Sequence, residues 1–506
     1  MAAWRRWAAL GILLMPVLLI SIDVTVLGFA LPALTAELEP SGFQLLWIVD
    51  IYSFLLAGLL LLMGNLGDRI GRRLVLLSGG AVFGLASLIA AFASSPELLL
   101  AARALLGIGG ATLMPSTLSL IRSVFPDARE RQTAIAVWAA AYAGGTAIGP
   151  VLGGWLVEHF WWGAVFLVNV PIMAILLMGG ALALPESRSP DPGPFDPVSA
   201  LLSIAGMLTL VYGLKMLGGG GSPASGIAAT ATGGVLLWIF LRRQTTLPEP
   251  LLDVGLFRNR KFCLAVTINM ITMLVFLPLL FFIPQYFQLL LGMSPFIAGL
   301  WMIPESVASI IGSMLAPRLP RHRSVFGPIA AGLLIAAGGL ALGTRLTTAG
   351  ELWLFVPLSL GVGGGIGMVD ALTNDVIVTS APPQRTGSAA AVSETAYEFG
   401  AAMGTAVFGT LGLAIYRHRL AADLPVALTD TQWDTASQTL AGAQHVAAEL
   451  TPQAGSALGA VASTAFATGM AWVFGATAAV CLAAAGLALR MHRRFIASRA
   501  VGRRDP

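Results

Sequence analysis

The chain has 506 residues, of which 57% are hydrophobic and only 11% are charged. Soluble domains carry about 25% charged residues, so this composition excludes an ordinary soluble protein and predicts a helical membrane protein. The formal net charge of +4 does not indicate a nucleic-acid partner, because the basic residues gather in short segments between apolar runs.

Apolar runs of about 20 residues, enough to cross the ~30 Å hydrocarbon core of a bilayer, recur along the whole chain and predict fourteen membrane-spanning helices. The first run follows Arg5 and Arg6 like a signal peptide, but it has no convincing cleavage site, and we interpret it as an uncleaved first helix. The predicted spans are residues 8–33, 44–64, 74–94, 97–121, 133–157, 162–184, 197–217, 225–241, 262–290, 296–317, 325–345, 351–379, 387–415 and 462–490.

The spans predict an all-α fold of two six-helix bundles with two additional helices. The expected parts are an N-terminal bundle (1–184), a linker with the additional helices (185–243), an amphipathic cytoplasmic connector (244–261), a C-terminal bundle (262–490) and a basic tail (491–506). Most of the 29 Lys and Arg residues fall on one side if both termini are cytoplasmic, as cytoplasmic loops require. We therefore expect a multi-pass protein of the inner (cytoplasmic) membrane.

Two connecting segments differ from ordinary short loops. Residues 185–196 are too rich in proline for a helix and predict a cytoplasmic linker. Residues 416–461 form a long outer loop, in which Ala-rich stretches at 429–440 and 441–450 predict a short helical hairpin. This hairpin either gates an outer opening or is an ordinary surface loop.

Acidic side chains within or near the apolar spans are the main functional signal. A charge at the bilayer centre costs about 2.5–3.5 kcal/mol on insertion scales, so such residues predict a water-filled path, a partner or a cation. The seven acids are Asp23, Asp50, Glu305, Asp370, Asp375, Glu394 and Glu398. We interpret Asp23, Glu394 and Glu398 as proton-exchanging groups and Asp50, Glu305 and Asp370 as groups near a cationic substrate. A purely structural role is the alternative for each, and it is favoured for Asp375.

Two spacings sharpen this interpretation. Arg103 lies at a depth similar to that of Asp23 and is expected to pair with it or to lie near it. Glu394 and Glu398 are four residues apart and share one helix face. Two close carboxylates hinder each other's ionisation, so at least one is expected to hold a proton near neutral pH.

Aromatic faces attract delocalised cations, and those proposed to line a substrate path are Tyr52, Trp138, Tyr142, Phe282, Trp301 and Tyr397. Packing is the alternative for each. No cofactor or metal is expected, because Cys263 and Cys481 lack metal-ligand spacing and no histidine lies well inside a span. The sequence contains no nucleophile–base pair and no phosphate-binding loop that would indicate an enzyme.

The segment Gly64–Arg73 joins the second and third predicted spans. Its glycines allow a tight turn, and Asp68 is placed to contact Arg72 or a neighbouring helix end and to hold the cytoplasmic side closed. The residues expected to form this gate are Gly64, Gly67, Asp68, Arg69, Gly71, Arg72 and Arg73. Ordinary basic residues of a cytoplasmic loop are the alternative.

A second motif lies in the fifth span, where small residues let helices pack backbone to backbone in lipid and a proline removes a backbone donor. A closely packed helix here favours a closed state that does not leak, and generic packing is the alternative. The motif residues are Gly145, Gly149, Pro150, Gly153 and Gly154.

These segments resemble the signatures of the major facilitator superfamily. Residues 64–73 are similar to its loop motif, Arg103 with Leu106–Gly110 to its fourth-helix motif, 145–154 to its antiporter motif, and 23–32 to the first-helix motif of its fourteen-span drug/proton antiporter branch. Residues 47–52 and 393–398 resemble exporters of quaternary ammonium compounds and cationic dyes. The second half departs from repetition, since Pro317–Arg323, the counterpart of the loop motif, lacks glycines and an acid.

The resemblance implies a monomeric, proton-coupled multidrug antiporter that exports lipophilic mono- and dicationic compounds, such as quaternary ammonium antiseptics and ethidium, by alternating access. Two alternatives stay open. One is a transporter of a different small molecule, although Arg103 and Lys215 are few intramembrane bases for an anion carrier. The other is a non-transporting membrane sensor, for which the loops offer no sizeable domain.

Overall fold

The computed structural model describes residues 3–188, 196–218, 222–248, 250–319, 324–382, 386–424 and 426–501. Most of the expected linker (189–195), the basic run Arg321–Arg323 of the second-half loop segment and the last tail residues (502–506) lie outside the described residues. The described ranges contain helices and no β-strand, and fourteen helical segments in them are long and apolar enough to cross a bilayer. The prediction of a fourteen-span all-α membrane protein is therefore confirmed.

The helices follow the predicted spans closely in the first part of the chain. They are α1 (Ala3–Leu38), α2 (Gly42–Ile70), α3 (Arg72–Ala91), α4 (Pro96–Val124), α5 (Ala128–His159), α6 (Ala164–Leu167), α7 (Asn169–Ala183), α8 (Pro197–Gly218) and α9 (Pro223–Gln244). The helix starts are locally encoded. Ser41 and Gln44 form a reciprocal capping box at the start of α2, and Asp127 accepts hydrogen bonds from the first turn of α5.

The second part contains short irregular helices as well as long ones. They are η1 (Val254–Arg258), α10 (Arg260–Gln285), η2 (Tyr286–Leu290), α11 (Pro295–Leu300), α12 (Ile303–Leu315), η3 (Ala316–Arg318), α13 (Phe326–Gly343), α14 (Leu352–Ser380), α15 (Thr386–Gly404), η5 (Thr405–Gly409), α16 (Thr410–Asp423), α17 (Asp430–Gln438), α18 (Leu440–Glu449) and α19 (Pro452–Val501). Helix α19 begins well before the predicted residue 462, because the small, Ala-rich residues after Pro452 favour a helix without being apolar enough to predict a span.

The chain divides into two compact units that do not follow a single cut in the sequence. The first unit comprises Met1–Leu252, Pro284–Leu300 and Thr429–Glu449, and the second comprises Asp253–Ile283, Trp301–Leu428 and Leu450–Pro506. Helix α11 and the predicted outer hairpin, now seen as α17 and α18, therefore pack with the N-terminal helices.

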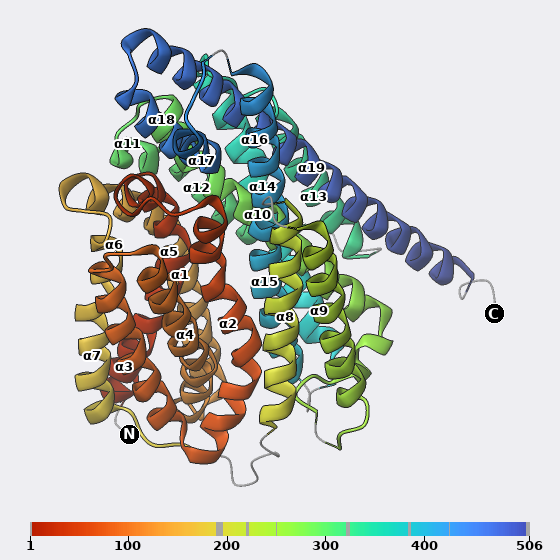
Figure 1. Cartoon of the computed structure of the whole chain (residues 1–506). Helices are drawn as coiled ribbons and strands as arrows, with labels where there is room; N and C mark the ends of the chain where they lie inside the picture. Colours follow the sequence, from red (N-terminus) through yellow and green to blue (C-terminus); the bar gives the residue numbers. More distant parts are fainter. Residues whose placement is uncertain are drawn as a thin grey trace. The chain divides into compact units, whose positions relative to one another are not determined.

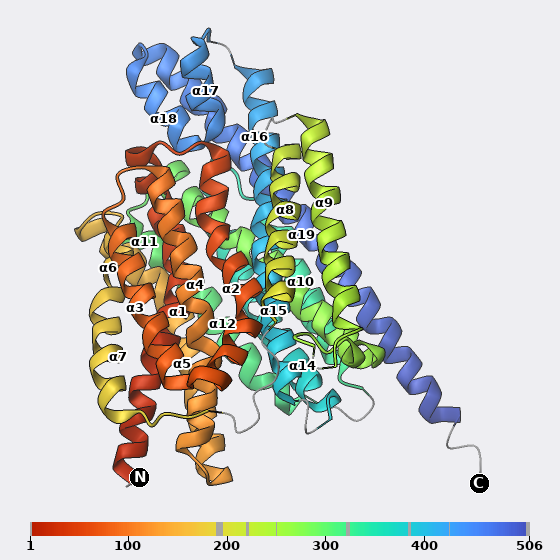
Figure 2. The ribbon, with the colours of Figure 1, turned by 60° about the horizontal axis from the view of Figure 1, so that its bottom comes forward.

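In the first unit, α1 packs against α4, α5 and α7, while α3 packs against α4 and α7 (Figure 1). Helix α2 lies between α4 and α8, and α8 pairs along its length with α9, as both views show (Figure 2). In the second unit, α14 packs against α12, α13 and α15, and α19 packs against α13 and α16.

The additional helices α8 and α9 form a tightly packed hairpin. A Cβ added at Gly213 would overlap Thr230, and one at Gly233 would overlap the backbone of Leu210, so the two helices approach closely. At the open end of the hairpin, Arg243 Nη2 of α9 lies 3.1 Å from Oδ1 of Asp196, the residue that precedes α8. Burial alone would raise the pKa of Asp196, but hydrogen bonds from Ser199 and Arg243 leave that pKa below its usual value.

Candidate substrate and proton site

Asp23 of α1 forms a buried ion pair with Arg103 of α4, as the sequence predicted. Arg103 Nη1 lies 2.6 Å from Asp23 Oδ2, and the two side chains are 2% and 1% exposed. The guanidinium also donates to the carbonyl oxygens of Ile48, at 3.1 Å, and Val49, at 3.4 Å, on α2. The other carboxylate oxygen, Asp23 Oδ1, is buried and has no hydrogen-bond partner among the described residues. That oxygen is chemically free to accept a proton.

Tyr52 belongs to the same cluster rather than to an open substrate surface. Its side chain is 1% exposed, and the Arg103 guanidinium carbon lies 4.7 Å from its ring centroid. Phe166 offers Arg103 a second ring at 5.9 Å. The Tyr52 ring therefore contacts a guanidinium cation of the protein itself in this structure.

Asp50 of α2 forms a second buried ion pair, with a partner that the sequence did not indicate. Lys215 Nζ of α8 lies 2.9 Å from Asp50 Oδ2, and the two side chains are 0% and 1% exposed. The same ammonium lies 4.3 Å from the ring centroid of Trp47. Asp50 thus faces a cation of the protein itself in this structure.

Three acids of the second unit, Glu305, Asp370 and Glu394, have a different environment. Asp370 of α14 accepts a hydrogen bond from Thr272 of α10 at 2.7 Å, and Glu305 of α12 accepts one from Ser306 at 3.4 Å. Within the ranges that the structure describes, neither of these acids nor Glu394 of α15 forms an ion pair with Lys or Arg. Glu305 is 8% exposed, and Asp370 and Glu394 are half-buried. A carboxylate withdrawn from water without a cation is costly unless it holds a proton, so these three acids are suited to exchange a proton for a cation.

Contacts bring three helices of the second unit together around these acids. Ser393 of α15 donates to Asn374 of α14 at 2.9 Å, and a Cβ at Gly400 of α15 would overlap the carbonyl oxygen of Met270 on α10. Glu398 is 2% exposed on α15, whereas Asp375 of α14 is exposed. The exposure of Asp375 fits the structural role favoured for it.

One residue of this region was missed from the sequence. Asn269 of α10 is 1% exposed, and neither its amide nitrogen nor its amide oxygen has a hydrogen-bond partner in the described part of the chain. It precedes Thr272 by one helical turn, and Thr272 contacts Asp370. A buried amide without partners is a costly feature, so Asn269 is a candidate to bind a guest or water beside Asp370. A polar residue within the apolar run 262–290 was the available signal.

The remaining aromatic candidates have varied surroundings. Phe282 is 3% exposed and packs against Phe281 and Phe466, and the Trp301 ring meets that of Phe355 edge-on at 6.3 Å. Trp138 of α5 is half-buried and donates to Thr117 of α4 at 3.3 Å. Tyr142 and Tyr397 are also half-buried. Phe282 is therefore a packing residue in this structure, while Trp138, Tyr142 and Tyr397 retain accessible ring surface.

The loop motif between α2 and α3 is held by the segment that follows α7. Gly71 separates the helices with φ +124°, a conformation that suits glycine. Arg72 pairs with Asp68 at 2.8 Å, so the predicted contact between these two residues is present. The backbone N–H of Arg72 donates to Ser187 O at 2.9 Å, and Arg73 Nη1 donates to Leu184 O at 3.0 Å. Hydrogen bonds to the residues that follow α7 thus hold the loop between α2 and α3 in place.

The glycines of the antiporter-like motif set the position of the α1 turn that carries Asp23. A Cβ at Gly145 would overlap Ser21 Oγ, one at Gly149 would overlap Thr25 Oγ1, and one at Gly153 would lie 2.5 Å from Val26 Cγ2. On the next face, Gly154 packs against the backbone of Pro295 at the start of α11. Small residues therefore give α1 and α5 backbone-to-backbone packing on both sides of Asp23.

Substitution of Gly149 by alanine tests this packing. We expect Gly149→Ala to destabilise the protein by about 1–3 kcal/mol, as overpacking does, and to slow transport because the α1 turn must shift. Gly144→Ala is the matched control on the same helix, since nothing lies within 4 Å of an added Cβ there. Thermal unfolding in detergent and dye efflux should separate the two variants, and indistinguishable behaviour would contradict the packing role.

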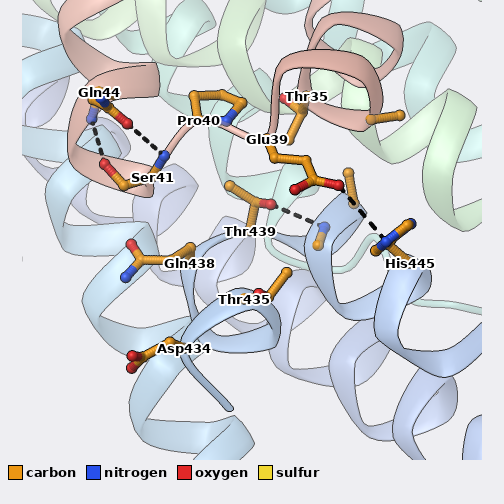
Figure 3. Close-up of a pocket in the computed structure, with 13 residues that line it drawn as sticks. Thr35, Glu39, Pro40, Ser41, Gln44, Asp434, Thr435, Gln438, Thr439 and His445 are labelled. Atoms are coloured by element: carbon orange, nitrogen blue, oxygen red, sulfur yellow. Dashed lines mark hydrogen bonds and ion pairs between the residues drawn. The ribbon is translucent and has the colours of Figure 1, made fainter. Parts of the chain in front are cut away.

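The predicted outer hairpin is present, and it packs on the turn between α1 and α2. Gly42 N donates to Gln438 of α17 at 3.0 Å. Figure 3 shows the second contact, in which His445 Nε2 of α18 lies 3.6 Å from Glu39 Oε1. Glu39 has φ +47°, a strained value for a residue with a side chain. The hairpin and the turn enclose a polar pocket of about 380 Å³ that includes Thr35 and Asp434.

Fourteen spans with acids buried inside them are typical of a membrane transporter. The family model for the Major Facilitator Superfamily matches residues 13–405. The chain belongs to the major facilitator superfamily, and it is a transporter rather than an enzyme.

Several similar proteins are drug exporters by name. The chain is 46% identical over 494 residues to the multidrug efflux pump LfrA of Mycolicibacterium smegmatis, covering 97% of each chain. It is 36% identical over 462 residues to the methyl viologen resistance protein SmvA of Salmonella typhimurium, covering 90% of this chain and 92% of SmvA. It is 32% identical over 504 residues to the tetracenomycin C resistance and export protein of Streptomyces glaucescens, covering 96% and 91%.

Solved structures agree in fold. A bacterial homologue of the human lysosomal transporter Spinster, in an inward-facing and unoccupied conformation, matches with a TM-score of 0.67 at 16% identity, covering 98% of this chain and 99% of that one. A D-xylose–proton symporter matches with a TM-score of 0.58 at 15% identity, covering 80% and 90%. Together, the relatives and the fold place the chain among drug-export transporters with many membrane spans.

Proposed function

We propose that this protein exports lipophilic mono- and dicationic compounds from the cytoplasm in exchange for protons. The observation that carries the proposal is the contrast between the acids within its membrane spans. Asp23 and Asp50 each face a basic side chain of the protein, whereas Glu305, Asp370 and Glu394 form no ion pair within the described residues. An acid in the latter environment holds either a proton or an external cation, and mutually exclusive occupancy by the two is the basis of antiport.

The roles follow from these environments. Glu394, with Glu398 one turn away, exchanges protons, and Asp370 and Glu305 lie nearer the cation. Thr272 and Asn269 supply neutral polar groups beside Asp370. Asp23 takes part in proton exchange through Oδ1. When that proton leaves, the positive charge of Arg103 balances the negative charge of the Asp23 carboxylate.

In the proposed transport cycle, the protein reorients when its carboxylates are neutralised. Outside protons neutralise the carboxylates of the outward-open state and displace the cation, and the neutral protein then reorients at low electrostatic cost. Protons leave to the cytoplasm, and the restored negative charges attract the next cation. The Asp68–Arg72 loop contact holds the cytoplasmic side closed in the outward-open state.

The similar proteins support the cationic class. Methyl viologen is a flat aromatic dication, and resistance to it is the property for which SmvA is named. The half-buried rings of Trp138, Tyr142 and Tyr397 suit such guests through cation–π attraction. We further propose that the protein works as a monomer in the cytoplasmic membrane with both termini inside.

A transport panel in proteoliposomes tests the proposal. With an imposed pH gradient, we expect ethidium and methyl viologen to be transported against their gradients and a protonophore to stop this transport. An anionic dye of similar size is the matched comparison and should not move. Gradient-driven transport of the anionic dye, without transport of either cation, would contradict the proposal.

A further inference from the structure

The ion pair between Asp50 and Lys215 lies where the additional helices meet the N-terminal bundle. Lys215 is one of only two lysines in the chain, and its side chain is fully buried. Its ammonium is held by the Asp50 carboxylate at 2.9 Å and by the Trp47 ring at 4.3 Å. A carboxylate combined with an aromatic face is the chemistry that binds a lipophilic cation, so Lys215 occupies a complete cation site within the first unit.

Helix α8 is fixed along α2 on both sides of this pair. The rings of Phe43 and Tyr212 meet edge-on at 5.8 Å, and a Cβ at Gly58 would lie 2.5 Å from Ile204 Cγ1. The ammonium therefore cannot leave Asp50 without a movement of α8 or a change in the lysine side chain. In this structure the packing of α8 on α2 therefore holds Lys215 beside Asp50.

The other charged groups near Asp50 balance among themselves. Arg103 of α4 donates to the carbonyl oxygens of Ile48 and Val49, and its own charge is matched by Asp23 of α1. Helix α8 carries no other charged residue, and α3 carries only Arg72 and Arg73, at the opposite end of α2. Among the charged groups of α3, α4 and α8, the ammonium of Lys215 is thus the one that contacts the Asp50 carboxylate.

We propose that Lys215 is a positioning residue that serves as the resident counter-cation of Asp50. It keeps Asp50 ionised, prevents protons and cationic substrates from using that carboxylate, and thereby restricts exchange to the other acids. This inference rests on the proposed proton-coupled export. The inference gives the additional α8–α9 hairpin a role in transport, because Lys215 of α8 supplies the ammonium that occupies the site formed by Asp50 and Trp47.

Three variants test the inference. Lys215→Gln removes the ammonium from Asp50, Asp50→Asn removes the carboxylate from Lys215, and the double variant replaces the ion pair by two neutral amides. The readouts are the amount of protein in the membrane, its thermal unfolding in detergent, and the pH profile of ethidium transport. A purely structural pair would change stability but not the pH profile.

We expect Lys215→Gln to add a titrating group to the pH profile, with transport at least roughly tenfold lower on the alkaline side, where Asp50 would be ionised and uncompensated. The double variant should restore the wild-type profile, because no titratable group is left at the site. If Lys215→Gln fails to reach the membrane, Lys215→His takes its place, because an imidazole loses its charge near neutral pH and should bring the same alkaline loss of transport. A wild-type profile in Lys215→His, or an altered profile in the double variant, would overturn the inference.

Other results would also overturn the inference. A wild-type pH profile in folded Lys215→Gln would show that the ammonium does not control Asp50. Equal loss of cation transport in Asp50→Asn and in the double variant would make Asp50 itself a substrate carboxylate. Failure of the proposed function would appear separately, as absence of proton-driven transport in the wild-type protein.

Discussion

Replacement of Asp23 by asparagine is expected to abolish proton-driven efflux of ethidium. The substitution keeps the size of the side chain but removes both the exchangeable proton and the negative charge opposite Arg103, which lies 2.6 Å away. Loss of a coupling free energy of about 1–3 kcal/mol corresponds to roughly 5–150-fold in the coupled equilibrium, so the initial rate of efflux should fall at least roughly tenfold. Dye efflux from energised vesicles measures this directly.

A general loss of structure must be separated from a loss of coupling. Breaking a buried ion pair by removing one partner destabilises a protein by about 3–5 kcal/mol, so thermal unfolding of the Asp23 variant should be recorded beside transport. Glu37→Gln makes the same change of charge on the same helix at an exposed position and should transport normally. Wild-type efflux by a folded Asp23→Asn variant would exclude Asp23 from proton exchange.

Substitution of Glu394 by glutamine is expected to abolish the proton release that a cationic dye evokes from the purified protein. Glu394 forms no ion pair within the described residues, so an arriving cation can displace its proton without first breaking a contact with Lys or Arg. Glu398→Gln should reduce the release rather than abolish it, because the two acids titrate as a pair and one site would remain. A pH electrode or indicator in weakly buffered detergent solution measures the release.

An acid of the same unit provides the control. Asp375 of α14 is exposed, so Asp375→Asn should leave the evoked proton release at the wild-type level. Unchanged release in Glu394→Gln, together with a loss in Asp375→Asn, would move the exchanging group to the end of α14. Unchanged release in both would leave Glu305 and Asp370 as the exchanging acids.

The fourteen spans were predictable because membrane insertion depends on local quantities, namely the length and apolarity of a run. The Ala-rich outer hairpin was also predictable, since propensity and the Thr429 capping box are local as well. The start of α19 before residue 462 was not, because the Ala-rich residues after Pro452 favour a helix without being apolar enough to predict a span.

The pairing of charges was only partly predictable. Asp23 and Arg103 were expected to meet because they lie at a similar depth, each in a segment that resembles a motif of the family. The structure contains their ion pair. Asp50 and Lys215 are separated by the Pro-rich linker, and which helix α8 packs against is decided by tertiary contacts such as those of Gly58 and Ile204. Asp50 therefore looked like an unmatched acid in the sequence, and only the packing of α8 supplies its partner.

The grouping of the chain into units also exceeds what the sequence indicates. Residues 284–300 and 429–449 lie far along the sequence, yet they pack with the first unit. Two contacts explain this placement: Gly299 of α11 packs against the backbone of Pro150, and Gln444 of α18 donates to Leu289 O at 2.8 Å. Such contacts depend on chain folding in three dimensions and leave no periodic signal.

Simultaneous recording of dye and proton movement in proteoliposomes is the most direct test of the account. With an acidic interior and methyl viologen or ethidium outside, the wild-type protein should accumulate the cation while protons leave the lumen, and each flux should stop when the other ion is absent. Cation accumulation of equal rate and extent without a pH gradient, or proton movement indifferent to the cation, would contradict exchange at shared carboxylates.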